Sequence, residues 1–189
     1  VADKPYLSPG FVLPYSTARG CWWRKCAFCP ETAEGNPYLP LSPARDAEEL
    51  RTITEKTGPS LIHILDSSIA PVRLQAMAQQ PPGIPWYGFA RVTEHLTNED
   101  FCRELKAGGC VMLKLGIESG DQCVLDSLNK GIDLKTASAA LKTITGAGSA
   151  TYCYFLFGTP QENEASAVKT LDFAACHAGC INFLNLAVF

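Results

Sequence analysis

Several features are missing from this chain of 189 residues, and each absence narrows its possible functions. No run of about 18 or more apolar residues occurs, so we expect no membrane-spanning helix. Positive charge is not in excess, since the formal net charge is -3, and nothing favours non-specific binding to nucleic acid. No secretory signal peptide is recognisable. Linkers and low-complexity tracts are also absent, and we expect residues 1–189 to form a single domain.

The cysteines are numerous but give no sign of a disulfide framework. Nine are present, an odd number, in a chain large enough to bury a core without cross-links. Six of them are scattered along expected helices and strands, where a free cysteine packs as a small apolar side chain. These six are Cys102, Cys110, Cys123, Cys153, Cys176 and Cys180. This usage indicates a reducing compartment, so we expect a cytoplasmic protein.

The other three cysteines lie in one short loop. Cys21, Cys26 and Cys29 have the spacing C-x4-C-x2-C. Three thiolates that can converge on one point suit an iron–sulfur cluster. No further cysteine lies between Pro30 and Phe101, so such a cluster would keep one iron without a protein ligand. An iron atom without a protein ligand could take part in a reaction as well as in electron transfer.

Two closed metal sites share parts of this pattern. Structural zinc needs four ligands in a tetrahedral arrangement, and the next candidates, His63 and Cys102, lie on expected regular elements. A plant-type ferredoxin has the same spacing but needs another cysteine soon afterwards. The alternative function is therefore a closed zinc or electron-transfer module without catalysis, which a fourth protein ligand would support.

Strand and helix signals alternate along the chain. Strands are expected at 11–15, 61–65, 86–92, 110–117, 152–157 and 181–188. Helices are expected at 42–56, from 71, at 97–107, 121–128, 134–144 and 162–178. This alternation predicts an α/β fold with a parallel sheet, either open and doubly wound or curved into a barrel. In both, functional residues lie at the carboxyl ends of strands, where the cysteine loop is expected.

An apolar strand followed by three cysteines, with an aromatic residue just before the third, resembles the radical S-adenosylmethionine (radical SAM) superfamily. That family mostly uses C-x3-C-x2-C, and this chain has one extra residue between its first two cysteines. Of the open and the curved sheet, the resemblance implies the curved one, a partial TIM-like (β/α)6 barrel. Because the chain stops at its sixth expected strand, we expect a truncated core domain from a longer protein.

One segment favours particular branches of the family. The end of the fourth expected strand, Leu115–Gly120, resembles the ribose-contacting part of radical SAM proteins. Together with Val124-Leu125 and Lys130-Gly131, it is similar to the cobalamin-binding and coproporphyrinogen-dehydrogenase-like branches. The resemblance implies that the carboxylate of Glu118 accepts hydrogen bonds from a ribose. Taken in isolation, Glu118 would read as a surface residue that starts the next helix.

The resemblance implies four further cofactor-binding residues. Gly158 lies in a turn similar to one near the adenosyl group, although ordinary strand-to-helix turn chemistry also explains it. Asp66 and Ser67 stand where many members have a Gly-Gly-Glu-like motif, absent here, that holds the methionine amino group. The alternative is that Asp66 or Ser68 only caps the next helix. Arg91 would bind the methionine carboxylate or an acidic substrate. Its structural alternative is a buried ion pair with Glu118.

The implied function is that of a radical SAM enzyme. A 4Fe-4S cluster on Cys21, Cys26 and Cys29 would bind S-adenosylmethionine and cleave it reductively to a 5′-deoxyadenosyl radical. That radical would abstract hydrogen from a substrate that the sequence does not identify, and no side chain is assigned as catalytic. The implied partner is a reductant, such as flavodoxin or ferredoxin, while a dependence on cobalamin, bound through a missing domain, stays open. A further hypothesis is that the isolated core is inert because an upstream cobalamin domain or a downstream cap is needed to complete the active site.

Overall fold

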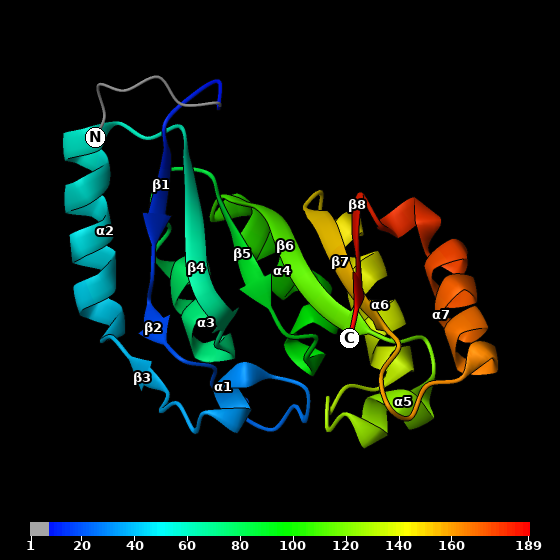
Figure 1. Cartoon of the computed structure of the whole chain (residues 1–189). Helices are drawn as coiled ribbons and strands as arrows, with labels where there is room; N and C mark the ends of the chain where they lie inside the picture. Colours follow the sequence, from blue (N-terminus) through cyan, green and yellow to red (C-terminus); the bar gives the residue numbers. More distant parts are fainter. Residues whose placement is uncertain (1–7) are drawn as a thin grey trace.

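A six-stranded parallel sheet organises the computed structural model, which describes residues 8–189 except for the side chains of 43–45. Its strand order is β1-β4-β5-β6-β7-β8, so each new strand joins the same edge (Figure 1). The bounds are β1 (Val12–Tyr15), β4 (Leu61–Ile69), β5 (Trp86–Ala90), β6 (Cys110–Glu118), β7 (Ala150–Phe157) and β8 (Phe183–Val188). The predicted α/β fold with a parallel sheet is confirmed.

Helices connect the strands and lie on one face of the sheet. The longer ones are α2 (Pro43–Thr57), α3 (Pro71–Gln79), α4 (Glu99–Ala107), α6 (Leu134–Gly146) and α7 (Glu164–Cys176). Shorter ones are α1 (Pro30–Ala33), α5 (Gln122–Ser127) and the 3-10 turns η1 (Glu94–Thr97) and η2 (Ala178–Cys180). Within residues 8–189, no helix has the length and apolar character that crossing a membrane requires.

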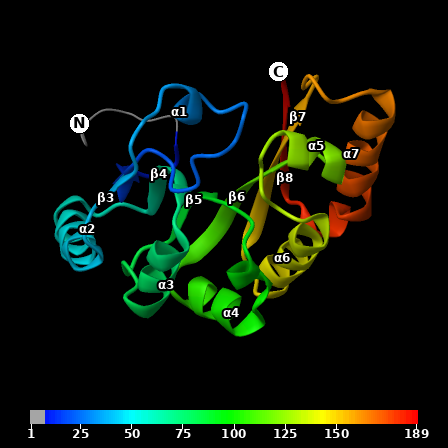
Figure 2. The same ribbon diagram turned by 90° about the horizontal axis from the view of Figure 1, so that it is seen from below.

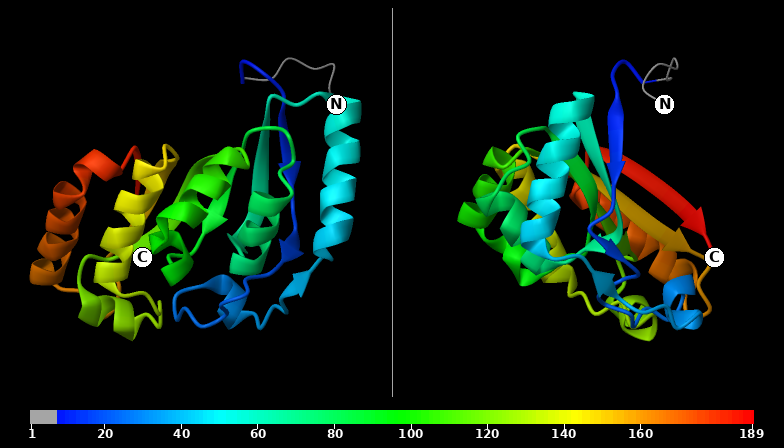
Figure 3. Two further views of the ribbon diagram at one scale, coloured as in Figure 1. Left: turned by 180° about the vertical axis from the view of Figure 1, so that it is seen from behind. Right: turned by 90° about the vertical axis from the view of Figure 1, so that its left-hand side faces the viewer.

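The sheet is curved, with the longer helices on its convex side (Figures 2 and 3). Along β6, Leu113, Leu115 and Ile117 are buried in the main hydrophobic core, because alternate residues of a strand point to the same face. The intervening Lys114 and Gly116 are half-buried and point to the opposite, concave face. The partial barrel that the sequence predicted is therefore confirmed, and within residues 8–189 no long helix lies across its concave side (Figure 1).

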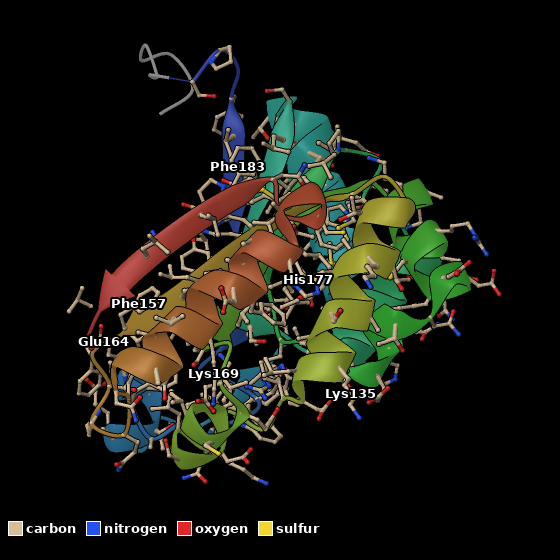
Figure 4. The ribbon with its side chains drawn as sticks, turned by 90° about the vertical axis from the view of Figure 1, so that its right-hand side faces the viewer. Lys135, Phe157, Glu164, Lys169, His177 and Phe183 are labelled. Carbon is tan, nitrogen blue, oxygen red and sulfur yellow. The ribbon has the colours of Figure 1, made fainter. Side chains whose placement is uncertain are left out.

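The last unit packs on the barrel through α7. Lys169 of α7 extends toward α5, where its Nζ atom lies 2.8 Å from Oδ2 of Asp121 (Figure 4). The hydroxyls of Ser119 and Thr170 are 3.1 Å apart beneath this ion pair. Strand β8 forms the edge of the sheet beside α7 and begins at Phe183, which is exposed.

Two local features differ from the sequence prediction. Strand β4 does not end at Leu65 but continues to Ile69, with an irregular register against β5 between Ile64 and Ile69. The segment around the cysteines also contains a small antiparallel pair, β2 (Ala18–Arg19) and β3 (Leu39–Pro40). This pair closes the cysteine loop at its base. The alternation of long strands and helices in the sequence does not predict such a short pair.

Candidate functional site

The segment between β2 and β3, which contains the three cysteines, lies at the carboxyl end of the sheet (Figure 1). Cys26 is buried, Cys21 and Cys29 are half-buried, and all three are free thiols. Cys29 occupies the N-cap position of α1, and its carbonyl accepts hydrogen bonds from Thr32 and Ala33. Its own N–H donates to the carbonyl of Cys26 at 3.2 Å, so a turn and a short helix together shape the loop.

Asp66 anchors the beginning of this loop to β4. Its Oδ1 accepts from the backbone N–H of Thr17 at 2.7 Å and of Ala18 at 3.2 Å. Its Oδ2 accepts from the Thr17 hydroxyl at 2.5 Å, and Asp66 is only 2% exposed. Both oxygens of Asp66 are therefore engaged by Thr17 and Ala18, which ties the start of the cysteine loop to β4. Asp66 does not cap α3, whose N-cap is Ala70.

The residues after Asp66 hold the other parts of the loop. Ser67 is exposed, and its hydroxyl donates to Oε1 of Glu31 on α1 at 3.1 Å. Ser68 is buried, and its hydroxyl accepts from the indole N–H of Trp22 at 3.2 Å. The unexpected length of β4 thus brings three consecutive polar residues under the cysteine loop.

The connection after α5 supports the loop from its other side. The N–H of Ala27 donates to the carbonyl of Leu128 at 2.8 Å, and the indole N–H of Trp23 donates to that of Asn129 at 3.1 Å. Gly131 lies directly under the Trp23 ring, where a Cβ atom would be 2.1 Å from Cζ2. Its φ of +64° is also in the region that favours glycine. Both the close approach of the Trp23 ring and the backbone conformation therefore favour glycine at this position.

Arg91, just after β5, lies beneath the cysteines. Its guanidinium lies 4.1 Å from the ring centroid of Trp23 and 5.8 Å from that of Trp22. One nitrogen lies 3.9 Å from Sγ of Cys26, and another donates to the carbonyl of Lys130. Nε is buried, and no group in the described part of the chain accepts a hydrogen bond from it. Arg91 therefore lies near the site, as expected, and its Nε–H group is the donor for which no acceptor is described.

Glu118 ends β6 with a φ of +67°, a conformation that non-glycine residues rarely adopt. Its Oε1 lies 2.7 Å from Nζ of Lys130, and both side chains are largely buried. A Cβ atom at Gly116 would lie 2.5 Å from that oxygen and 2.7 Å from that nitrogen, so the absence of a side chain there makes room for the pair. The suggested ion pair of Glu118 with Arg91 is wrong, because Lys130 takes that place.

Lys130 is the residue that sequence reasoning missed. The sequence marks it only as part of a family-like segment, and nothing in the linear sequence connects it with the strand end 12 residues earlier. Its Nζ also lies 5.6 Å from the ring centroid of Phe28, inside the cysteine loop. Lys130 therefore connects the acidic strand end with the cysteines.

Charge around the cysteines is balanced by these two cations. Burial raises the pKa of the Cys26 thiol, while the positive charges of Lys130 and Arg91 oppose that increase. Burial lowers the pKa of Arg91, and the nearby Cys26 and Cys21 oppose that decrease. Within residues 8–189, no three His, Cys, Asp or Glu side chains are arranged to hold a single metal ion. Thiolates of a multi-iron cluster each bind a different iron, so they stand farther apart than the ligands of one ion.

Gly158 lies at the same end of the sheet, immediately after β7. It has a φ of +76°, and its N–H donates to the carboxylate of Glu162. A Cβ atom there would make only an ordinary contact, 3.6 Å from Val188. The backbone conformation, not lack of space, is what favours glycine at this turn.

Residues 15–174 match the family model described as the radical SAM superfamily. Over 165 residues the chain is 29% identical to an uncharacterized methyltransferase from Pyrococcus horikoshii, covering 84% of this chain and 35% of that protein. Over 163 residues it is 22% identical to an anaerobic magnesium-protoporphyrin IX monomethyl ester cyclase from Rubrivivax gelatinosus, covering 83% and 29% respectively. The chain thus spans about a third of the length of these curated relatives.

Solved structures show the same fold at low sequence identity. The radical S-adenosylmethionine methyltransferase TsrM from Kitasatospora setae has a TM-score of 0.79 and 18% identity, over 95% of this chain and 37% of that one. The coproporphyrinogen III oxidase HemN from Escherichia coli has a TM-score of 0.62 and 14% identity, over 95% and 44%. The TsrM structure is described with cobalamin and a [4Fe-4S] cluster bound.

Proposed function

Because this chain belongs to the radical SAM superfamily of enzymes, we propose that it binds a 4Fe-4S cluster through Cys21, Cys26 and Cys29, with S-adenosylmethionine beside it. The observation that carries the proposal is a loop of three free thiols, fixed from both sides, with Arg91 and Lys130 beneath it. This donor set fits the cluster, since soft thiolates are its ligands and nearby cations offset its negative charge. When bound, the cluster supplies the electron for reductive cleavage of S-adenosylmethionine.

The side chains around the loop have separate tasks in this proposal. Arg91 and the two indoles shield the buried thiol from water, and the unpartnered Nε of Arg91 is available to a carboxylate such as that of methionine. Glu118 offers its second oxygen to the ribose hydroxyls while Lys130 holds the first. The exposed hydroxyl of Ser67 retains lone pairs that can accept from the methionine amino group.

Asp66 and Gly158 act through the backbone. Asp66 positions the cysteine loop against β4 through its three hydrogen bonds. Gly158 shapes the turn after β7 that faces the same end of the sheet. Holding a reacting centre with rigid supporting contacts is a general requirement of preorganised sites.

The whole protein's reaction is proposed more broadly. Two of its relatives are named a methyltransferase and a cyclase, and the TsrM structure is described with cobalamin bound. We propose a cytoplasmic enzyme that takes its electron from a flavodoxin- or ferredoxin-type partner and abstracts hydrogen from its substrate. Cobalamin would be supplied by a part of the whole protein outside this domain.

Anaerobic reconstitution with iron and sulfide tests the proposal. Electron paramagnetic resonance of the reduced protein should show a 4Fe-4S signal that shifts when S-adenosylmethionine is added. Cys26→Ala should lose the signal. Cys123→Ala, which removes an exposed cysteine outside the loop, should keep it. A signal indifferent to S-adenosylmethionine, or bound zinc with a fourth protein ligand, would favour the closed metal-binding module.

A further inference from the structure

The concave face of the sheet carries a cluster of aromatic side chains around one lysine. The members of this cluster occupy alternate positions of three neighbouring strands and face away from the helices. They are Tyr87 and Phe89 of β5, Lys114 of β6, and Tyr152 and Tyr154 of β7. Phe89 and Tyr152 are the register neighbours of Lys114 on either side. The rings of Phe89 and Tyr154 have centroids 4.9 Å apart, and those of Tyr152 and Tyr154 are 4.8 Å apart.

Lys114 places its charge among these rings. Its Nζ lies 4.1 Å from the ring centroid of Phe89, 5.8 Å from that of Tyr154 and 6.0 Å from that of Tyr87. In the part of the chain that the structure describes, no carboxylate forms an ion pair with it. Cation–π contacts offset part of the cost of partly burying this charge. Burial still lowers the pKa of Lys114, which is the sign of a charge not fully compensated.

The polar groups near Lys114 are donors or neutral. His63 stacks on Tyr87 with ring centroids 4.3 Å apart, and its pKa is lowered by burial and by the charge of Lys114. Burial raises the pKa of Tyr87, and that of Tyr154 to about 12, so both hydroxyls stay protonated at neutral pH. The cluster thus carries one cation, Lys114, and the hydroxyl groups of three tyrosines, Tyr87, Tyr152 and Tyr154.

The cluster is continuous with the proposed cofactor site. Lys114 and Glu118 lie on the same strand, with Gly116 between them on the concave face. Four residues of a strand span about 13 Å, and the Glu118–Lys130 ion pair packs over the intervening Gly116, so the cluster directly adjoins this pair. Among the residues that the structure describes, no long helix crosses this face (Figures 1 and 2).

We propose that this cluster is the substrate-recognition surface and that it selects a planar aromatic molecule carrying a carboxylate. The rings of Phe89 and Tyr154 stack on the planar part, and the Lys114 ammonium binds the carboxylate. Lys114 is the specificity-determining residue. This inference rests on the proposed function, since it takes the concave face as the place where the reaction occurs. The simpler alternative is that Lys114 only packs its methylene groups on the rings, and then its charge is without effect on binding.

Three small probes distinguish these two possibilities. 2-Naphthoate is planar and anionic, 2-naphthamide is planar and neutral, and cyclohexanecarboxylate is anionic but not planar. Binding to the full chain is measured by protein-observed NMR titration. 2-Naphthoate should bind roughly ten-fold or more tightly than either other probe, because only it makes both the charge-assisted and the stacking contact.

Variants of Lys114 show whether the charge is responsible. Lys114→Met, which keeps the length of the side chain, should abolish the preference for naphthoate over naphthamide, and Lys114→Arg should keep it. Lys142→Met on α6 is the matched surface control. Failure of naphthoate to bind, equal binding of naphthoate and naphthamide to the wild type, or an unchanged preference in Lys114→Met would overturn the proposal.

The same variants separate this proposal from the proposed function. After iron–sulfur reconstitution, Lys114→Met should give the same electron paramagnetic resonance signal, and the same shift with S-adenosylmethionine, as the wild type. Loss of naphthoate selectivity with an unchanged signal is the expected result. A wild type without any cluster signal would refute the proposed function, whereas a normal signal without naphthoate selectivity would refute the substrate surface alone.

Discussion

Replacing Asp66 tests whether the cysteine loop is positioned from β4. Asp66→Ala removes the acceptor of two backbone N–H groups and one hydroxyl, all buried. The Thr17 hydroxyl can rotate, but the backbone donors of Thr17 and Ala18 stay in place. At about 1–3 kcal/mol for each unsatisfied buried donor, the loss of stability is about 2–6 kcal/mol. That is a large share of the typical total of about 5–15 kcal/mol.

Asp66→Asn gives the intermediate case. The amide oxygen can accept from both backbone donors, and the Thr17 hydroxyl can reverse to accept from the amide nitrogen. Only the charge is lost, so we expect a cost of about 1–2 kcal/mol. Urea unfolding followed by circular dichroism measures both variants, and iron content after reconstitution reports on the loop itself. Iron content should fall in the order wild type, Asp66→Asn, Asp66→Ala.

Asp133→Ala is the control for a general loss of stability. Asp133 caps α6 by accepting from the N–H groups of Lys135 and Thr136, away from the cysteines. Its removal should cost about 0.5–2 kcal/mol and leave iron content unchanged. If Asp66→Ala and Asp133→Ala lost iron equally at matched stability, or if Asp66→Ala lost neither stability nor iron, the positioning argument would be refuted.

Three other changes test different contacts. Gly131→Ala should destabilise more, and lose more iron in reconstitution, than Gly35→Ala: both glycines have a left-handed φ, +64° and +68°, but only the first would place a Cβ against a ring. Lys130→Met should cost about 3–5 kcal/mol in urea unfolding because it strands the buried carboxylate of Glu118, and adding Glu118→Gln should restore most of it. The pKa of His63 is lowered in the folded state, so the unfolded chain binds a proton at a higher pH than the folded chain, and the free energy of unfolding falls as the pH drops below 6.5. His63→Phe should therefore make the melting temperature less sensitive to pH in that range. An equal sensitivity in wild type and variant would contradict this.

The sheet was predictable because its signals are local. Apolar segments separated by helical ones specify parallel strands, and the loop after β1 has to lie at their carboxyl ends. The three cysteines were identifiable for the same reason, since one loop contains all of them. The same reasoning located Glu118 at a strand end and Arg91 near the site, which the structure shows.

The partners of these residues were not predictable because they depend on long-range packing. Asp66 reads as a polar residue at a strand end, and only the fold shows Thr17 and Ala18 donating to it from 49 and 48 residues away. Lys130 belongs to a loop that the sequence marks only by its neighbouring glycine. Its pairing with Glu118 depends on a left-handed backbone and a side-chain-free Gly116, neither of which periodicity reveals.

The two cations beneath the cysteines join loop positioning to cofactor binding. Arg91 donates to the backbone after α5 and stacks on the loop's tryptophans, while Lys130 connects Glu118 with Phe28. A variant of either residue therefore changes the loop, its electrostatics and the proposed cofactor contacts together. Iron content alone does not separate these effects. The shift of the cluster signal with S-adenosylmethionine does, because a variant that still loads iron but no longer shifts has lost a contact to that ligand and not the loop.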